Sequence, residues 1–228
     1  MKFKLIKSVP VKADIRSFIF EPDTPLTWQP GQYFHYVLDH ADADDRGNER
    51  WFTNSAAPSE RFVMISTRIS EVNGSSFKRA LVALKPGDLI EADGPEGDFT
   101  LGDSKRNYLF IAGGIGITPF RSMLKEADTK GNKLNVDLLY ANRTSEIAFS
   151  DEFNQFAINN PNLKIEYIIQ PDQINQGLLN QKLNKINDPL IYVSGPEAMV
   201  KSLAEQLLQL GLGKDSIKTD DFPGYSGV

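Results

Sequence analysis

The chain has 228 residues, of which 40% are hydrophobic and 10% aromatic, and its formal net charge is −5 at pH 7. Such a length and composition are ordinary for a folded protein with one large or two small domains. The mild acidic excess predicts no nucleic-acid partner. Because the chain contains no cysteine, it has no disulfide, no thiolate catalyst and no cysteine-ligated iron–sulfur cluster. Any redox chemistry must therefore come from a bound cofactor.

Neither a membrane segment nor an export signal is expected. The longest apolar run, 108–120, is too short and too rich in glycine to cross a bilayer, and Met1–Lys7 lacks the apolar core of a signal peptide. We therefore expect no membrane span and a cytoplasmic location. His35 and His40 have no carboxylate or cysteine partners at ligand spacing, so we expect no metal site.

The first hundred residues predict an antiparallel β-barrel with Greek-key connections. Short segments rich in β-branched and aromatic residues alternate with Pro, Gly and Asp, which is typical of strands and turns. One helix is expected at Ser75–Leu84, where apolar residues recur at helical spacing and Pro86-Gly87 follows. The polar segment Asp42–Glu49 is interpreted as a solvated loop tip without chemistry. The expected strands are Phe3–Ser8, Ile15–Glu21, Gln32–Asp39, Arg61–Arg68 and Asp88–Asp93.

From residue 107 onward the pattern predicts alternating strands and helices, which indicates an α/β domain with a doubly wound parallel sheet. The junction between the two halves is expected near 102–105. The expected strands are Tyr108–Ala112, Asn135–Ala141, Lys164–Ile169 and Leu190–Ser194, and the expected helices are Pro119–Ala127, Ser150–Asn159, Leu178–Ile186 and Glu197–Leu210.

The segment Tyr108–Pro119 runs a buried strand into a glycine-rich turn and then into a helix. Gly113, Gly114 and Gly116 lack the Cβ atoms that would keep a ligand off the backbone, and the free N–H groups of the helix start attract anionic oxygen. Pro119 suits a first helical turn. However, it also replaces the third glycine of the dinucleotide-binding pattern, so a plain strand-to-helix turn is an equally good interpretation.

A second motif, Arg50-Trp51-Phe52-Thr53, combines a guanidinium, aromatic rings and a hydroxyl. Arginine fits a pyrophosphate bidentately, and Phe52 can cover a flat ring while Thr53 reaches its heteroatoms. Aromatic residues on a barrel strand are also ordinary core residues. The motif resembles the flavin-binding signature Arg-x-Tyr-Ser/Thr of the ferredoxin-NADP reductase family, with Phe52 in place of the usual tyrosine.

The resemblance covers nearly the whole chain and implies an FAD-binding barrel domain at 1–102 and an NAD(P)-binding domain with a C-terminal aromatic tail at 103–228. The segments Gln29–Tyr33, Asn73–Lys78 and Gly94–Phe99 are similar to family motifs. At the start of the barrel helix the resemblance implies flavin phosphate binding, whereas simple helix capping explains the serines equally well. The residues concerned are Gly74, Ser75, Ser76, Phe77 and Lys78.

In the second half, Gly113–Pro119 and Tyr192–Met199 resemble the pyridine-nucleotide motifs of the same family. The resemblance places Thr118 at the nicotinamide, together with Ser194, Gly195 and Pro196, and Ser194 stands where cysteine is frequent. Parallel strand ends would bring both turns to one crevice.

The nucleotide and the C-terminal segment leave alternatives open. Arg143 would pair with a 2′-phosphate and so favours NADPH, yet relatives with arginine here also use NADH, and a solvent-facing arginine is an equal alternative. The C-terminal Asp221, Phe222 and Tyr225 resemble the acidic and aromatic segment that family members bring over the flavin, with Tyr225 as a mobile lid. The alternative is a strand that packs Phe222 into the core.

Together these features predict an NAD(P)H-dependent reductase that uses FAD and NADPH or NADH. Hydride would pass to FAD and electrons would go to an acceptor such as ferredoxin or another electron-transfer protein. Thr53, Ser194 and Asp221 are the predicted catalytic residues. The alternatives are a reductase of free flavins, quinones or ferric chelates, which are small redox acceptors, and an electron-transfer subunit of a larger oxidoreductase. A monomer or weak homodimer is expected.

Overall fold

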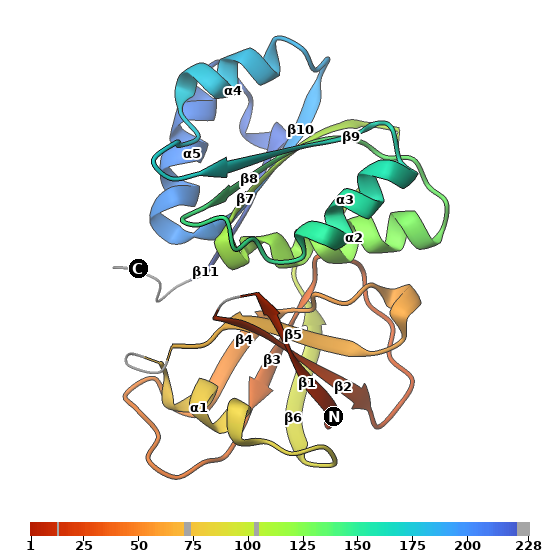
Figure 1. Ribbon diagram of the computed structural model, residues 1–228, viewed down its shortest axis with the longest axis vertical. Coiled ribbons are helices and arrows are strands. Elements are labelled where there is room, and N and C mark those ends of the chain that lie inside the picture. The colour runs from red at the N-terminus through yellow and green to blue at the C-terminus, as the bar shows by residue number, and fades with distance from the viewer. Residues whose placement is uncertain (13, 71–73, 103–104, 223–228) are drawn as a thin grey trace.

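The computed structural model describes residues 1–12, 14–70, 74–102 and 105–222. Figure 1 shows two lobes, one stacked above the other along the long axis of the molecule. The N-terminal lobe is built on an antiparallel sheet, and the C-terminal lobe has a parallel sheet with helices on both faces.

The N-terminal lobe is a six-stranded sheet in the order β4-β3-β6-β1-β2-β5. Its two edge strands meet through the bridge between Asn54 and Ile65, which curls the sheet into a barrel. Large aromatic side chains fill the barrel, including the fully buried Phe3, Phe34 and Tyr36. The strands are β1 (Lys2–Lys12), β2 (Ile15–Pro22), β3 (Tyr33–Val37), β4 (Glu49–Thr53), β5 (Val63–Arg68) and β6 (Leu89–Glu96).

One α-helix and one short 3₁₀ turn complete this lobe. Helix α1 (Ser76–Ala83) begins after Ser75, whose hydroxyl accepts a hydrogen bond from the Lys78 backbone N–H, and it buries Phe77 and Leu81 in the barrel core. The turn η1 (Pro58–Glu60) follows β4 and lies against the C-terminal lobe.

The C-terminal lobe is a parallel sheet in the order β11-β10-β7-β8-β9. Helices α2 and α3 bury one face, whereas α4 and α5 bury the other, so the sheet is doubly wound. The strand order reverses beside β7, which makes the crevice at the strand ends the expected ligand site of such a fold. The elements are β7 (Asn107–Gly113), η2 (Gly114–Ile117), α2 (Thr118–Thr129), β8 (Asn135–Asn142), α3 (Ser150–Asn159), β9 (Leu163–Ile169), α4 (Gln176–Leu183), β10 (Pro189–Pro196), α5 (Glu197–Gln209), η3 (Lys214–Ser216) and β11 (Ile217–Phe222).

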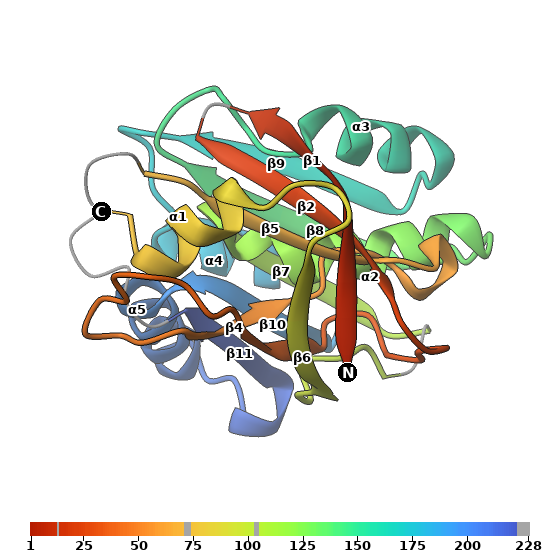
Figure 2. The same cartoon turned by 90° about the horizontal axis from the view of Figure 1, so that it is seen from below.

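These observations confirm the predicted fold class, because a barrel sheet is followed by a doubly wound parallel sheet. The C-terminal segment differs from the favoured prediction: 217–222 form β11, a parallel edge strand beside β10. Figure 2 shows the barrel strands in front of the α/β lobe when the molecule is seen from below. The boundary at 102/103 stays a prediction, and residues 103–104 lie outside the described part of the chain. Within the described residues, no helix has the length and apolar character needed to span a membrane.

Candidate functional site

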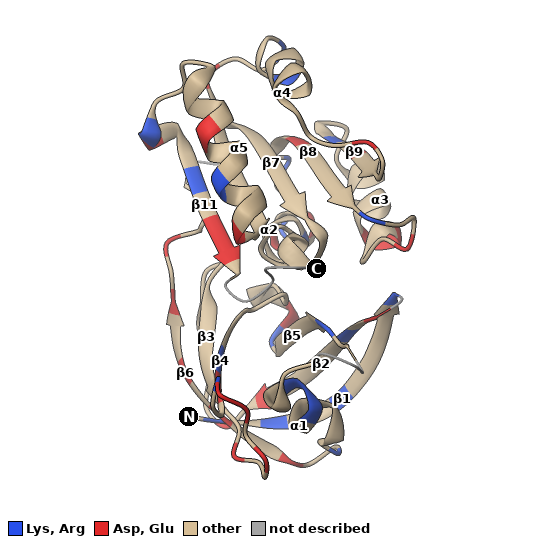
Figure 3. Cartoon of the chain, turned by 90° about the vertical axis from the view of Figure 1, so that its left-hand side faces the viewer, with Lys and Arg blue, Asp and Glu red and all other residues tan. Residues whose placement is uncertain are grey.

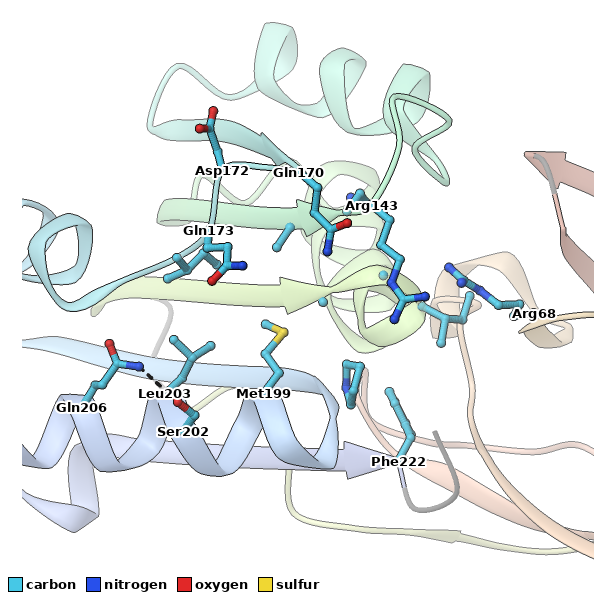
Figure 4. A pocket seen from close by; sticks show the side chains of 17 residues that line it. Arg68, Arg143, Gln170, Asp172, Gln173, Met199, Ser202, Leu203, Gln206 and Phe222 are labelled. Carbon is cyan, nitrogen blue, oxygen red and sulfur yellow. Dashed lines mark hydrogen bonds between the residues drawn. The ribbon is translucent and has the colours of Figure 1, made fainter. Parts of the chain in front are cut away.

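A cavity of about 380 Å³ opens at the carboxyl ends of β7, β8 and β10, at the point where the strand order reverses. Figure 4 shows Met199 and Leu203 of α5 along one side and Arg143 and Arg68 at one end. Of the residues predicted to bind a cofactor, five line this cavity: Gly113, Gly114, Arg143, Pro196 and Phe222. Arg68 belongs to β5 of the barrel, so residues of both lobes line the same cavity.

The three glycines of the turn have different roles. A Cβ atom at Gly116 would lie 2.3 Å from the carbonyl oxygen of Ser194, and one at Gly113 would lie 2.3 Å from the sulfur of Met199. These two glycines therefore let the turn pack against β10 and α5. Only Gly114, with φ of +52° and Arg68 as its sole neighbour within 4 Å, presents a bare backbone to open space. Gly113 and Gly114 therefore line the cavity as expected, whereas Gly116 serves packing and does not line it.

Two guanidinium groups face the same end of the cavity. Arg143 follows β8 and is exposed, and its guanidinium points toward that of Arg68 in Figure 4. Arg68 pairs with Asp14, Nε to Oδ2, at 3.2 Å. Two cations beside the bare backbone of Gly114 suit an anionic group such as a dinucleotide phosphate. The sequence analysis missed Arg68, because its place beside the turn depends on how the two lobes pack.

The acidic end of β11 points toward the barrel in Figure 3. Asp220 pairs in register with Ser194 on β10, and the Ser194 hydroxyl donates to Asp220 Oδ2 over 3.2 Å. Burial raises the pKa of Asp220 to about 6, the hydrogen bond from Ser194 lowers it, and the charge of Asp221 raises it. Asp221 itself is exposed. The structure therefore brings Asp220, and not the predicted Asp221, to Ser194, because neighbouring side chains on a strand point to opposite faces.

Several predicted residues lie beside the cavity without lining it. Ser194 is fully buried, and the Thr118 hydroxyl donates to the carbonyl of Ile115 within the turn, at 3.1 Å. Pro119 is buried in the first turn of α2, where no N–H is needed. Gly195 packs against Gly113, so it too supports the crossing of the two strand ends. Tyr225 lies outside the described residues.

On the barrel side, β4 presents its residues to two faces. The Phe52 ring packs against the Phe77 ring, with the ring centroids 5.9 Å apart. Thr53 is buried. Trp51 points away from the Phe52 side, is 57% exposed and stacks on His35 with ring centroids 4.5 Å apart. Since successive residues of a strand face opposite sides, Trp51 shares its face with Thr53, and its role beside a cofactor stays a prediction.

The start of α1 and Arg50 form an anion-binding cradle, and an acidic side chain of the chain itself occupies it. The backbone N–H of Ser76 donates to Asp44 Oδ2 over 2.7 Å, and the Ser76 hydroxyl accepts from the Asp44 backbone N–H over 2.9 Å. Arg50 Nη2 lies 3.4 Å from Asp44 Oδ1. The hydrogen bond from Ser76 holds the pKa of Asp44 well below its usual range. Asp44 of the loop 42–49 is therefore bound to α1 and Arg50, whereas the sequence analysis interprets this loop as a solvated tip.

This cradle fits the phosphates of a flavin nucleotide, because its donors already hold a carboxylate. A helix N-terminus and an arginine are the donors that phosphate prefers. Around it, Ser75 caps α1 and Phe77 belongs to the core. Lys78 Nζ donates to the carbonyl of Arg68 over 3.0 Å, and the carbonyl of Gly74 accepts from Arg79 over 2.6 Å. Asp44 would have to leave before phosphate oxygens bind there.

The two histidines have different partners, and His35 has a carboxylate partner that the sequence analysis did not expect. His35 Nε2 lies 2.9 Å from Glu49, and His40 Nδ1 lies 2.7 Å from the carbonyl of Leu38. Among the residues that the structure describes, no group of three or more acidic or histidine side chains is arranged to hold a metal ion.

Comparison with known proteins identifies the α/β lobe and the fold. Residues 110–205 match the family described as oxidoreductase NAD-binding domain. The chain is 27% identical over 244 residues to flavohemoprotein A of Dictyostelium discoideum, covering 100% of this chain and 61% of that protein. The chain thus spans about six-tenths of the length of the curated relatives it matches.

Two solved structures share the complete two-lobe arrangement. The FAD/NAD-binding domain of a nitric oxide dioxygenase from Vibrio cholerae superposes with a TM-score of 0.81 at 24% identity, covering 97% of this chain and 98% of that one. The ferredoxin-NADP+ reductase of Plasmodium falciparum superposes with a TM-score of 0.82 at 16% identity, covering 97% of this chain and 95% of that one. Residues 110–205 therefore match an oxidoreductase NAD-binding domain, and the whole chain has the two-lobe fold of these FAD/NAD-binding and ferredoxin-NADP+ reductase structures, which is the fold that its motifs predict.

Proposed function

We propose that this chain is an NAD(P)H-dependent flavin reductase, in which the barrel holds FAD and the α/β lobe presents NAD(P)H to it. The observation that carries the proposal is the cavity that both lobes line, with Arg68 from the barrel, Gly114 and Arg143 from the parallel sheet, and Phe222 at its rim. Reaction between two cofactors requires such a shared site, because the reacting atoms must approach to about 3–3.5 Å.

When bound, FAD supplies the redox centre that takes a hydride from NAD(P)H and passes electrons to an acceptor. In the barrel, Arg50 and the Ser76 N–H bind the pyrophosphate in place of the Asp44 carboxylate, and Thr53 lies at the ring edge. The support is the charge-assisted contact of Asp44 with the same donors.

On the other side of the cavity, Gly114, Arg68 and Arg143 bind the phosphates of the nucleotide, and Phe222 covers the aromatic rings. Ser194 and Asp220 support the nicotinamide site from behind, because the Ser194 hydroxyl donates to the Asp220 carboxylate and fixes the direction of both side chains. Two arginines at one end of the cavity favour NADPH, and NADH is the alternative.

For the acceptor, we propose an electron-transfer protein or a partner domain. The specific support is length: the chain spans 61% of a flavohemoprotein and 58% of another, so in these relatives the reductase portion is part of a longer protein. A reductase of small acceptors such as free flavins, quinones or ferric chelates is the competing proposal. Ferredoxin and a small quinone, supplied in turn to the reduced protein, distinguish the two.

The proposal is tested by incubating the purified protein with FAD, removing unbound FAD by gel filtration and adding NADPH or NADH without oxygen. We expect about one FAD per chain and loss of the yellow flavin absorbance on addition of the nucleotide. Arg143→Gln should weaken NADPH binding more than NADH binding. A protein that retains no FAD, or whose bound FAD stays oxidised with both nucleotides, would contradict the proposal.

A further inference from the structure

Arg121 lies at the contact between the two lobes and is only 6% exposed. Its guanidinium donates to the carbonyl of Ser55 at 2.7 Å, to both oxygens of Glu60 at 2.8 and 3.0 Å, and to both oxygens of Glu152 at 2.8 and 2.9 Å. Its carbon Cζ also lies 5.4 Å from the ring centre of Phe149. Every edge of the guanidinium is therefore engaged.

The partners of this guanidinium come from both lobes. Ser55 and Glu60 belong to the barrel, whereas Glu152 belongs to α3 of the α/β lobe. Burial lowers the pKa of Arg121, but the hydrogen bonds and charges of Glu60 and Glu152 outweigh it and raise the pKa. A cation that is buried between two carboxylates stays charged, and removing one partner leaves an uncompensated buried charge.

Neighbouring residues of α2 bind the same barrel segment. The Ser122 hydroxyl donates to the carbonyl of Ala56 over 2.7 Å, and Glu126 Oε2 accepts from the backbone N–H of Ser59 over 2.8 Å. Together with Arg121, these side chains hold residues 55–60 along one face of α2. The contact is polar and directional, which fixes a relative position more sharply than apolar packing does.

The position of Arg121 in the sequence links this contact between the lobes to both proposed ligand sites. Arg121 lies one helical turn after Thr118, which begins α2 behind the nucleotide turn, and its acceptor Ser55 lies two residues after Thr53 on the flavin side. A single guanidinium thus connects the segment that carries the proposed flavin contact to the segment that carries the proposed nicotinamide contact.

We infer that Arg121 is a positioning residue for hydride transfer: by holding residues 55–60 of the barrel against α2, it sets the distance between the flavin and the nicotinamide. The inference rests on the proposed function. Its physical basis is that transfer between two bound rings needs near-contact geometry, and an error of about 1 Å can cost on the order of 100-fold in rate.

The test compares Arg121→Lys and Glu60→Gln with the wild-type protein, all loaded with FAD. Lysine keeps the charge but loses the planar fork, and Glu60→Gln removes the barrel carboxylate that pairs with Arg121, while its remaining amide oxygen can still accept the Ala57 N–H. Lys125→Gln is the matched control, because Lys125 lies on the same helix over Phe156 of its own lobe. Three quantities are measured: the limiting rate of flavin reduction by NADPH in stopped flow, the Kd of FAD, and the Kd of the nucleotide.

We expect the limiting rate to fall at least about tenfold in Arg121→Lys and Glu60→Gln, while both Kd values change less than about threefold and dithionite reduces the flavin at the wild-type rate. The charge-transfer absorbance of the nucleotide complex should weaken in parallel. A limiting rate within twofold of wild type in Glu60→Gln, or a loss explained entirely by released FAD, would overturn the inference. A wild-type protein that no nucleotide reduces would instead refute the proposed function.

Discussion

Asp44 shows how one side chain determines whether a binding site is ready for its ligand. Its carboxylate accepts the Ser76 N–H and lies beside Arg50, where phosphate oxygens would bind. Because hydrogen bonding lowers the pKa of Asp44, this carboxylate stays ionised through the neutral range and protonation does not release it there. The chain therefore supplies its own competitor for the flavin pyrophosphate.

Asp44→Asn should bind FAD more tightly than the wild-type protein does. The variant loses the charge that competes for Arg50 and Ser76, and a charge-assisted hydrogen bond is worth about 1.5 kcal/mol or more, or roughly tenfold in affinity. Fluorescence titration of the apoprotein with FAD measures the Kd. Asp45→Asn, which changes an exposed residue of the same loop, is the control. Equal or weaker binding by Asp44→Asn than by this control would refute the competition.

Because the pKa of Asp220 is raised in the folded protein, we expect the thermal stability of the protein to depend on pH. Burial raises its pKa from 3.8 to about 6, so the ionised form is disfavoured in the folded chain relative to the unfolded one. The protonated Asp220 side chain contributes to the stability of the folded protein. This contribution is complete below the pKa that Asp220 has in the unfolded chain, and it is lost as the pH rises through about 6. Asp220→Asn, which mimics the protonated acid, should therefore melt near the wild-type temperature at pH 4 and on the order of 5 °C higher at pH 8.

Thermal melts of the apoprotein across this pH range check the expectation. Asp215→Asn serves as the control, because Asp215 is an exposed acidic residue in η3, before β11. A constant difference between Asp220→Asn and wild type at all pH values would show that Asp220 does not titrate in this way.

At the scale of elements, the glycine turn after β7 depends on close packing. A Cβ atom at Gly116 would meet only backbone atoms of Ser194 and Gly195, at 2.3 to 2.7 Å, and backbone cannot rotate away. Gly116→Ala should therefore destabilise the protein by about 1–3 kcal/mol and lower the Tm by several degrees. Gly213→Ala, at a position with nothing within 4 Å, should leave the Tm almost unchanged. Similar Tm values for both variants would contradict this role for Gly116.

The sequence was sufficient to predict most elements, since their periodicity is local. The helix Ser150–Asn159 was predicted to the residue, and the other expected elements differ at their ends by a few positions. Strand β4 (Glu49–Thr53) was not among the expected strands. A strand was only the alternative interpretation of the C-terminal segment, because two adjacent aspartates interrupt the apolar pattern of Ile217–Phe222. The register of β11 beside β10 was not predicted, and neither was the alternation that turns Asp220 toward Ser194.

The residues of the candidate site also fall into those that local sequence motifs located and those that only the tertiary packing brings to the site. Motifs located Gly114 and Arg143, which directly follow β7 and β8, and Arg50, which lies in β4. Arg68 reaches the cavity only through packing of the two lobes, and Asp44 reaches Ser76 only because a loop folds back over 32 residues of sequence. Contacts between segments so far apart carry no local signal.

At the scale of the whole molecule, two lobes share one cavity and are held by polar contacts at a fixed place. The Arg121 cluster fixes one side of the junction. On the other side, the Tyr192 hydroxyl donates to the Thr100 carbonyl over 2.8 Å and Lys218 donates to the Asp98 carbonyl over 2.9 Å. The relative position of the lobes, and so of any two ligands that they hold, is thus determined by two separate sets of polar contacts.

A crystal structure of the protein with FAD and a non-reacting nucleotide analogue tests the central claim most directly. We predict that the flavin ring lies between the β4 residues Phe52 and Thr53 and the nicotinamide end of the cavity, with phosphate oxygens on Ser76 and Arg50 and the Asp44 carboxylate displaced. FAD bound elsewhere, or a nucleotide whose nicotinamide lies out of contact with the flavin, would contradict the account.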